Sequence, residues 1–181
     1  MHQPDFEVIQ RVLAGETAAF DALVRRYQEE IYWLAYRMTR NKEDAKDLAQ
    51  ETFVSAYRSL GTFRGQSRLS TWLYRIAMNQ CLNHLKSAAR QDPVEVNGHL
   101  ADPREDSLAV LLADERDRAL ADAIEALPPQ QKATLILRVH QGLSHKEIAE
   151  ILGCSEGTAK ANYFHAVRAL QRKLPPFRDT G

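Results

Sequence analysis

The stretch Gly142-Leu-Ser-His-Lys-Glu-Ile-Ala-Glu-Ile-Leu-Gly-Cys-Ser-Glu-Gly-Thr-Ala-Lys160 decides the fold of the C-terminal part of this 181-residue chain. Ser144, with Glu147 three residues later, has the pattern of a capping box, which predicts where a first helix begins. Gly153 permits the positive φ of a tight turn, and Ser155 can cap a second helix. These signals together predict a helix-turn-helix, a unit whose second helix enters the major groove of DNA.

The predicted second helix of this unit has a basic, acid-free surface. Neither Asp nor Glu occurs between residues 157 and 178, whereas Lys or Arg stands at five positions there. Lys160 and Arg168 suit phosphate groups, and Asn162 and His165 suit base edges. The cap and turn signals would also fit a purely structural pair of helices, but the charge pattern favours binding of duplex DNA.

The remainder of the chain also has helical periodicity, and no convincing run of alternating strand residues is present. Thr17 is expected to cap a helix that begins near Phe20, and Asn41 to cap the next helix. The amphipathic stripes that predict helices lie at 6–13, 20–38, 45–60, 70–85, 108–127 and 133–140.

The segment 91–112 separates two groups of predicted helices, and it has no periodic apolar stripe up to residue 106. It contains two prolines, one glycine and five acidic residues, and it is longer than an ordinary connection inside a domain. We therefore expect an all-α fold with two small helical domains, 1–90 and 113–181, joined by a flexible acidic linker. The helix-turn-helix belongs to the second domain.

Charge is distributed unevenly although the formal net charge is zero. Residues 52–91 contain no acid, and this basic block and the one at 157–178 are compensated by acids that include a cluster between them. Such a distribution is typical of two separate nucleic-acid-binding surfaces. No run approaches the roughly 20 apolar residues that a membrane helix needs, and no secretion signal is evident, so we expect a cytoplasmic protein.

Patterns of catalysis and metal binding are missing from the sequence. Cys81 and Cys154 are too far apart to predict a zinc site or a disulfide framework, and the six histidines are scattered. No nucleophile with a neighbouring base and no glycine-rich phosphate loop is evident. We expect no enzyme activity, no metal and no cofactor.

Aromatic and basic residues alternate around a glycine-containing loop that begins at Phe63. Aromatic rings that stack on bases, combined with cations that follow phosphates, suit single-stranded nucleic acid. The alternative is a buried core, which is the favoured interpretation for Trp72, Leu73 and Ile76 because of their helical spacing. Asn79, polar and on the helix that follows, could bond a base or cap a neighbouring backbone group.

The helix over 45–60 has a polar side formed by Asp44, Asp47, Gln50 and Glu51. The ordinary explanation of such a side is a solvated face. Its proximity in sequence to a possible single-strand site makes a protein partner a second interpretation.

Four motifs occur in a fixed order over nearly the whole chain. The first two are Asp44-Ala-Lys-Asp-Leu-Ala-Gln-Glu-Thr-Phe-Val-Ser-Ala-Tyr57 and Phe63-Arg-Gly-Gln-Ser67 with Ser70-Thr-Trp-Leu-Tyr-Arg-Ile-Ala-Met-Asn79. The others are Leu127-Pro-Pro-Gln-Gln-Lys132 and the segment 143–160. The first pair resembles the second conserved region of extracytoplasmic-function (ECF) sigma factors, and the second pair resembles their fourth.

The resemblance implies a bacterial transcription initiation subunit. Its expected partners are core RNA polymerase, through the β′ clamp helices and the β flap, promoter DNA, and an anti-sigma protein. The clamp-helix contact would fall on Asp44, Asp47, Gln50 and Glu51. The minus-ten contact would fall on Phe63, Arg64, Gly65, Ser67, Arg68, Arg75, Asn79, Asn83 and Lys86. The minus-thirty-five contact would fall on Ser155, Glu156, Thr158, Lys160, Ala161, Asn162, Phe164, His165 and Arg168.

The sequence departs from the pattern of the family in its predicted recognition helix. Ala161 and Asn162 replace a frequent Ser-Arg pair, and His165 stands at an often basic position. The promoter preference of better-known members therefore does not transfer to this chain. A helix-turn-helix regulator that binds duplex DNA without polymerase is the alternative, and it leaves the polar side around Asp47 and Glu51 unexplained.

Overall fold

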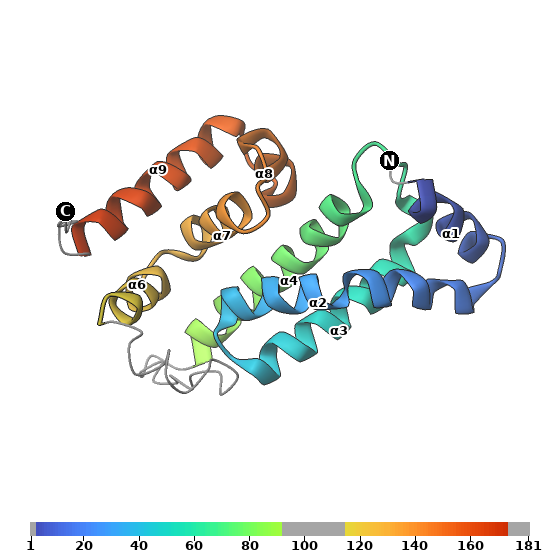
Figure 1. Cartoon of the computed structure of the whole chain (residues 1–181), viewed down its shortest axis with the longest axis horizontal. Helices are drawn as coiled ribbons and strands as arrows, with labels where there is room; N and C mark the ends of the chain where they lie inside the picture. The colour runs from blue at the N-terminus through green and yellow to red at the C-terminus, as the bar shows by residue number, and fades with distance from the viewer. Residues whose placement is uncertain (1–2, 92–114, 174–181) are drawn as a thin grey trace, which may run out of the picture. The chain divides into compact units, whose positions relative to one another are not determined.

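The computed structural model describes residues 3–91 and 115–173, and every regular element within these ranges is helical (Figure 1). This confirms the all-α fold class. The chain divides into two compact units, one built around helices α1 to α4 and the other around α6, α7 and α9. The predicted linker, 91–112, lies outside the described residues except for Gln91, which ends α4.

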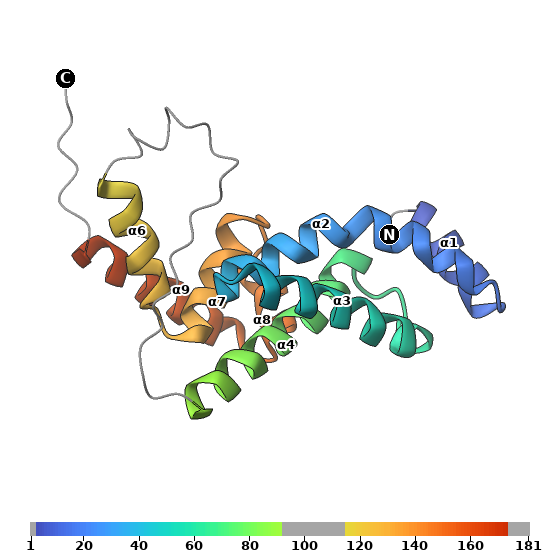
Figure 2. The same ribbon diagram turned by 90° about the horizontal axis from the view of Figure 1, so that it is seen from below.

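The first unit consists of four α-helices and two short 3₁₀ helices. Helices α2, α3 and α4 pack on one another and lie side by side in both views (Figures 1 and 2). The helices of this unit are α1 (Gln3–Leu13), η1 (Thr17–Ala19), α2 (Phe20–Thr39), α3 (Lys42–Ser59), η2 (Leu60–Thr62) and α4 (Leu69–Gln91).

The core of this unit combines large aliphatic side chains with small ones. Ile31, Leu34 and Met38 of α2 are fully buried, as are the alanines Ala45 and Ala56 of α3. Small side chains allow neighbouring helix axes to approach closely, and the burial of apolar surface holds the three helices together. The predicted stripes at 20–38 and 45–60 therefore lie where the sequence indicated.

Helix α1 is fixed to α2 by a buried carboxylate. Asp5 is 2% exposed, accepts a hydrogen bond from the hydroxyl of Tyr27 at 2.7 Å and pairs with Arg26. The predicted cap at Thr17 is wrong, because Thr17 begins η1 and the residue before α2 makes no side-chain cap. A 3₁₀ turn, in which the Ala19 N–H bonds a carbonyl three residues back, leads into the helix instead.

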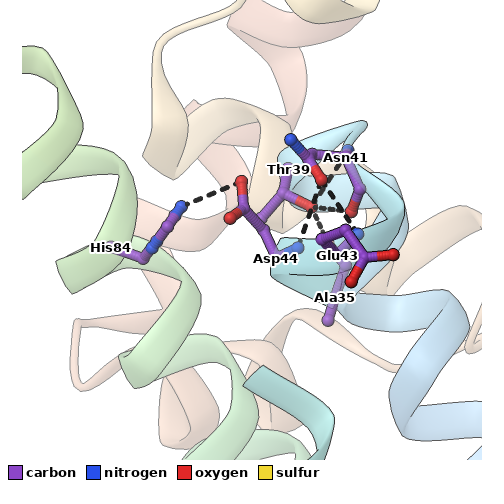
Figure 3. A network of polar contacts seen from close by, with 6 residues as sticks. All are labelled: Ala35, Thr39, Asn41, Glu43, Asp44 and His84. Carbon is purple, nitrogen blue, oxygen red and sulfur yellow. Dashed lines mark hydrogen bonds and ion pairs between the residues drawn. The ribbon is translucent and has the colours of Figure 1, made fainter. Parts of the chain in front are cut away.

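The junction between α2 and α3 confirms the predicted cap at Asn41 (Figure 3). The side-chain oxygen of Asn41 accepts hydrogen bonds from the backbone N–H groups of Glu43, at 2.9 Å, and Asp44, at 3.2 Å. Arg40 ends α2 in the left-handed conformation, with φ 54°. A polar cap and a reversed dihedral thus allow α3 to begin after only two residues, Arg40 and Asn41, beyond the end of α2.

The helices that follow the predicted linker are α6 (Glu115–Glu125), α7 (Pro129–Val139), α8 (His145–Leu152) and α9 (Glu156–Lys173), and the second unit is built around α6, α7 and α9. Pro129 occupies the first turn of α7, where its missing N–H costs nothing. Leu127 and Leu135 are buried together with Ala166 of α9. The partly buried side chains around this cluster are Ile124, Tyr163, Val167, Ala169 and Leu170.

Within the described residues, no helix is both long enough and apolar enough to cross a membrane. No group of three or more His, Cys, Asp or Glu side chains that could hold a metal ion occurs there either.

Candidate nucleic-acid and protein interfaces

The helix-turn-helix forms as its local signals predict. The backbone N–H and the hydroxyl of Ser144 both donate to the Glu147 carboxylate at 2.8 Å, and the Glu147 N–H donates to the Ser144 hydroxyl. Gly153 has φ 65°, and the Ser155 hydroxyl accepts from the Thr158 N–H at 3.0 Å. This reciprocal box and the cap fix where α8 and α9 begin.

The outward side of α9 carries an exposed cation that is already paired. Lys160 Nζ lies 2.8 Å from a carboxylate oxygen of Glu156, one turn earlier, and both side chains are exposed. This hydrogen bond, followed by the charge attraction to Lys160, holds the pKa of Glu156 below its usual range. Lys160 can reach a phosphate only by leaving or sharing Glu156, an anion that a phosphate would also repel.

An exposed aromatic ring lies further along α9. Phe164 is 57% exposed, and the guanidinium of Arg168 lies 5.8 Å from the centre of its ring. The ring of His165 meets Phe164 edge-on at 5.8 Å. Of the nine residues predicted to face duplex DNA, only Asn162 is partly shielded, and the others are exposed: Ser155, Glu156, Thr158, Lys160, Ala161, Phe164, His165 and Arg168.

A second candidate surface consists of the loop between η2 and α4 and the outward side of α4. Phe63 and Trp72 pack against each other with their ring centres 5.4 Å apart. The glycine of this loop, Gly65, has φ 68°. The charged and amide side chains predicted to meet the minus-ten element are all exposed: Arg64, Arg68, Arg75, Asn79, Asn83 and Lys86.

For some aromatic and aliphatic residues, the sequence left base stacking and core burial as alternatives. The structure shows which of these residues are buried and which are partly exposed. Leu73 is 3% exposed and belongs to the core. Trp72 and Ile76 are half-buried, as is Phe63. Part of the Phe63–Trp72 pair therefore remains exposed, in and next to the loop that also carries the exposed Arg64 and Arg68.

The polar side of α3 does not form one uniform patch. Asp47, Gln50 and Glu51 are exposed. Asp44 is half-buried and lies 3.3 Å from Nε2 of His84 on α4 (Figure 3). Asp44 thus stands at the edge of α3 that faces α4, whereas the other three side chains point away from the core.

A groove between α2 and α3 was not predicted from the sequence. It encloses about 880 Å³. Gln50 contributes to its wall, together with Val54 and Tyr57, which are 43% and 42% exposed. Tyr57 also meets the ring of Phe20 edge-on at 5.2 Å. From the sequence, Tyr57 is expected in the buried apolar stripe of α3, and Val54 lies outside that stripe. The packing of α2 shows instead that both side chains line a groove and are partly exposed.

Comparison with known proteins assigns both units. Residues 23–91 match the family description "Sigma-70 region 2", and residues 117–170 match "Sigma-70, region 4". The RNA polymerase sigma-H factor of Pseudomonas aeruginosa is 36% identical over 184 residues, which cover 96% of this chain and 95% of that protein. The chain belongs to the ECF group of the sigma-70 family. The ECF RNA polymerase sigma-E factor of Escherichia coli K12 is also 36% identical, over 95% of both chains.

The fold of this sigma factor has a counterpart among solved structures. The sigma factor RpoE of Bartonella quintana, solved in complex with the anti-sigma factor NepR, matches with a TM-score of 0.71 and 24% identity. The match covers 88% of this chain and 98% of that one. Membership of the family confirms the expectation of a transcription initiation factor, while the role of each predicted site residue remains a prediction.

Proposed function

We propose that this sigma factor binds core RNA polymerase through the first unit, opens the minus-ten element with the same unit, and reads the minus-thirty-five element with α9. The observation that carries this proposal is the separation of surfaces on one small helical unit. The acidic side belongs to α3 and the groove lies between α2 and α3, while the cations and amides assigned to the minus-ten element belong to α4 and the loop before it.

The polymerase contact is proposed to combine the groove with its acidic border. Gln50 belongs to both, because it lines the groove and lies beside the exposed carboxylate of Glu51. Val54 and Tyr57 offer apolar area that a partner can bury, while Asp47 and Glu51 supply charge at the rim. Apolar centres with polar rims are the usual composition of protein interfaces.

Opening of the minus-ten element is proposed to rely on the loop that begins at Phe63. Melting requires a base to leave its stack, and a pocket that receives the base offsets part of that cost. The half-buried Phe63–Trp72 pair provides a stacking surface, Asn79 provides hydrogen bonds to a base edge, and Arg64 with Arg68 supplies charge for the backbone.

Recognition of the minus-thirty-five element is proposed to rely on the exposed side of α9. Phe164 suits the methyl group of thymine, while Arg168 and Lys160 suit phosphates. The Glu156–Lys160 ion pair removes part of the positive charge from the first turn. The second unit alone is therefore expected to bind duplex DNA with a shallow salt dependence.

Three further expectations, about catalysis, location and regulation, follow from the same proposal. The chain supplies no catalysis of its own, since the polymerase performs the chemistry. It acts in the cytoplasm, where promoter DNA and polymerase meet. An anti-sigma protein regulates it by covering the polymerase-binding and DNA-binding surfaces, as suggested by the complex in which the Bartonella quintana relative was solved.

A reconstituted transcription assay tests this function against the rival regulator. Purified chain and core polymerase are added to a library of promoter fragments, and transcripts are sequenced with either component left out. The proposal expects transcripts only when both components are present. Tight duplex binding by the chain alone, with no transcripts in the complete mixture, would favour the regulator.

A further inference from the structure

A hydrogen-bonded bridge joins α3 to α4 between the two surfaces described above. Thr52 of α3 is fully buried, and its hydroxyl oxygen lies 2.6 Å from the side-chain oxygen of Gln80 on α4. The side-chain nitrogen of Gln80 donates to the hydroxyl of Ser55, one turn further along α3, at 3.0 Å. The amide of Gln80 therefore connects to two successive turns of α3.

The number of hydrogens available in this bridge determines which groups donate and which accept. Thr52 has a single hydroxyl hydrogen, and its oxygen also lies 2.7 Å from the carbonyl of Leu48. If Thr52 donates to that carbonyl, the reversed amide of Gln80 donates to Thr52 and accepts from the hydroxyl of Ser55. In both orientations of the amide, Gln80 links Thr52 with Ser55.

The bridge has a second member on the same side of α4. His84 lies one turn after Gln80, and its Nε2 stands 3.3 Å from the carboxylate of Asp44 (Figure 3). Positions four apart share one face of a helix, so one stripe of α4 holds α3 at two levels.

The other contacts of α4 include a buried apolar core and a hydrogen bond to α2, from the hydroxyl of Tyr74 to the carboxylate of Glu30. Ala45 and Ala56 of α3, like Ala77 of α4, are almost completely buried and present only a methyl group. Apolar burial is non-directional, so methyl groups set the rotation of one helix against another less sharply than hydrogen bonds do. Hydrogen bonds require a defined distance and angle, so the bridge adds to the Tyr74 bond a constraint on the rotation of α4 relative to α3.

We infer that Gln80 is a positioning residue, which fixes the rotation of α4 so that Asn79 faces the minus-ten base while α3 is held by polymerase. This inference rests on the proposed function. Gln80 directly follows Asn79 in α4, and Thr52 directly follows Glu51 in α3. The bridge therefore joins the neighbours of one residue assigned to DNA and one assigned to polymerase.

The geometry of a helix sets the size of the effect. The Cα atoms lie about 2.3 Å from the helix axis, which puts an asparagine amide at roughly 5 Å. A rotation of about 20° then moves that amide by about 1.7 Å, which exceeds the tolerance of roughly 0.5 Å for a functional site. Loss of the bridge thus alters how Asn79 meets the base without altering the exposed side of α3.

The test compares Gln80→Met, which keeps the length of the side chain but removes the amide, with the wild type and with Gln10→Met. Gln10 is an exposed glutamine of α1, so its replacement controls for the loss of an amide elsewhere. Open-complex formation is followed by fluorescence on promoters carrying each of the four bases at the position that Asn79 reads, and affinity for core polymerase is measured separately.

We expect Gln80→Met to slow opening of the preferred promoter roughly a hundredfold, since a misplacement of about 1 Å can cost that much. The preference for one base over the others should shrink by a similar factor, with polymerase affinity within about twofold of the wild type. Unchanged base preference would overturn the inference. An equal loss of polymerase affinity would also overturn it, since that result indicates a general loss of structure.

Two further measurements keep the inference testable if Gln80→Met folds poorly. Thr52→Val removes one of the two hydrogen bonds of the bridge from α3 and should shrink the base preference in the same direction but less, while the double variant should lose no more than Gln80→Met alone. In the free chain, loss of the bridge should shift the side-chain amide signals of Asn79 and leave those of Asn41 unchanged. If the wild-type chain opens no promoter with core polymerase, the proposed function fails. The amide signals are recorded without polymerase, so they test the positioning of Asn79 separately.

Discussion

Replacement of Tyr57 by alanine is expected to weaken the binding of core polymerase about 30-fold. Tyr57 lines the groove between α2 and α3 and is 42% exposed. A buried tyrosine removes about 200 Å² from water, so roughly 85 Å² of this side chain remains available to a partner. At about 25 cal/mol per Å², covering that area contributes about 2 kcal/mol, which corresponds to a factor of about 30 in Kd.

The buried and exposed areas of Tyr57 also determine the control variants and the temperature of the assay. The area that Tyr57 already buries, including its contact with Phe20, contributes up to about 3 kcal/mol to folding, so affinity is measured below the melting temperature of the variant. Tyr57→Phe keeps the ring and should bind normally. Phe6→Ala removes a ring of similar exposure, 45%, from α1, outside the groove.

Titration of labelled core polymerase with each variant gives the affinities. The reasoning is refuted if Tyr57→Ala remains folded and binds polymerase as tightly as the wild type. It is also refuted if Phe6→Ala weakens binding as much as Tyr57→Ala does.

Four other predictions concern the second unit and α1. Ser155→Ala removes the cap at the start of α9 and should destabilise the second unit by about 1 kcal/mol, seen as an earlier unfolding transition in urea. Lys160→Ala should weaken binding to minus-thirty-five duplex and make the salt slope shallower by about one unit, and an unchanged slope would mean that Lys160 meets no phosphate. Because Lys160 lowers the pKa of Glu156, their ion pair is fully formed when the pH lies above the usual pKa range of a carboxyl group. The pair is lost as the pH falls through the lowered pKa of Glu156. DNA affinity should therefore rise on acidification in the wild type more than in Glu156→Gln. Asp5→Asn leaves the partly exposed Arg26 without its buried carboxylate and should release α1, which limited proteolysis would detect as cleavage before residue 20; equal protection would contradict this.

The features that could be predicted from the sequence are those made by neighbours along the chain. The box of Ser144 and Glu147 and the cap at Asn41 each need only residues within three positions, so local chemistry decides them. Thr17 shows the limit of such signals. A 3₁₀ turn satisfied the same backbone groups, and nothing near Thr17 in the sequence distinguishes the two solutions.

The features that could not be predicted depend on side chains far apart in the sequence. His84 meets Asp44, and Gln80 meets Thr52, only because α3 and α4 pack at one particular rotation. The groove beside Tyr57 likewise exists only once α2 lies along α3. Periodicity gives the buried side of each helix, but it does not state which exposed side chains of two helices will meet.

Promoter opening by two variants of the first unit tests the central claim most directly. Fluorescence of a base analogue in the minus-ten element is recorded at increasing concentrations of Glu51→Ala or Asn79→Ala with core polymerase. The account predicts that Glu51→Ala needs more protein but opens at the normal rate when saturated, whereas Asn79→Ala binds polymerase normally and opens slowly at saturation. Identical behaviour of the two variants would contradict the claim that α3 serves polymerase and α4 serves DNA.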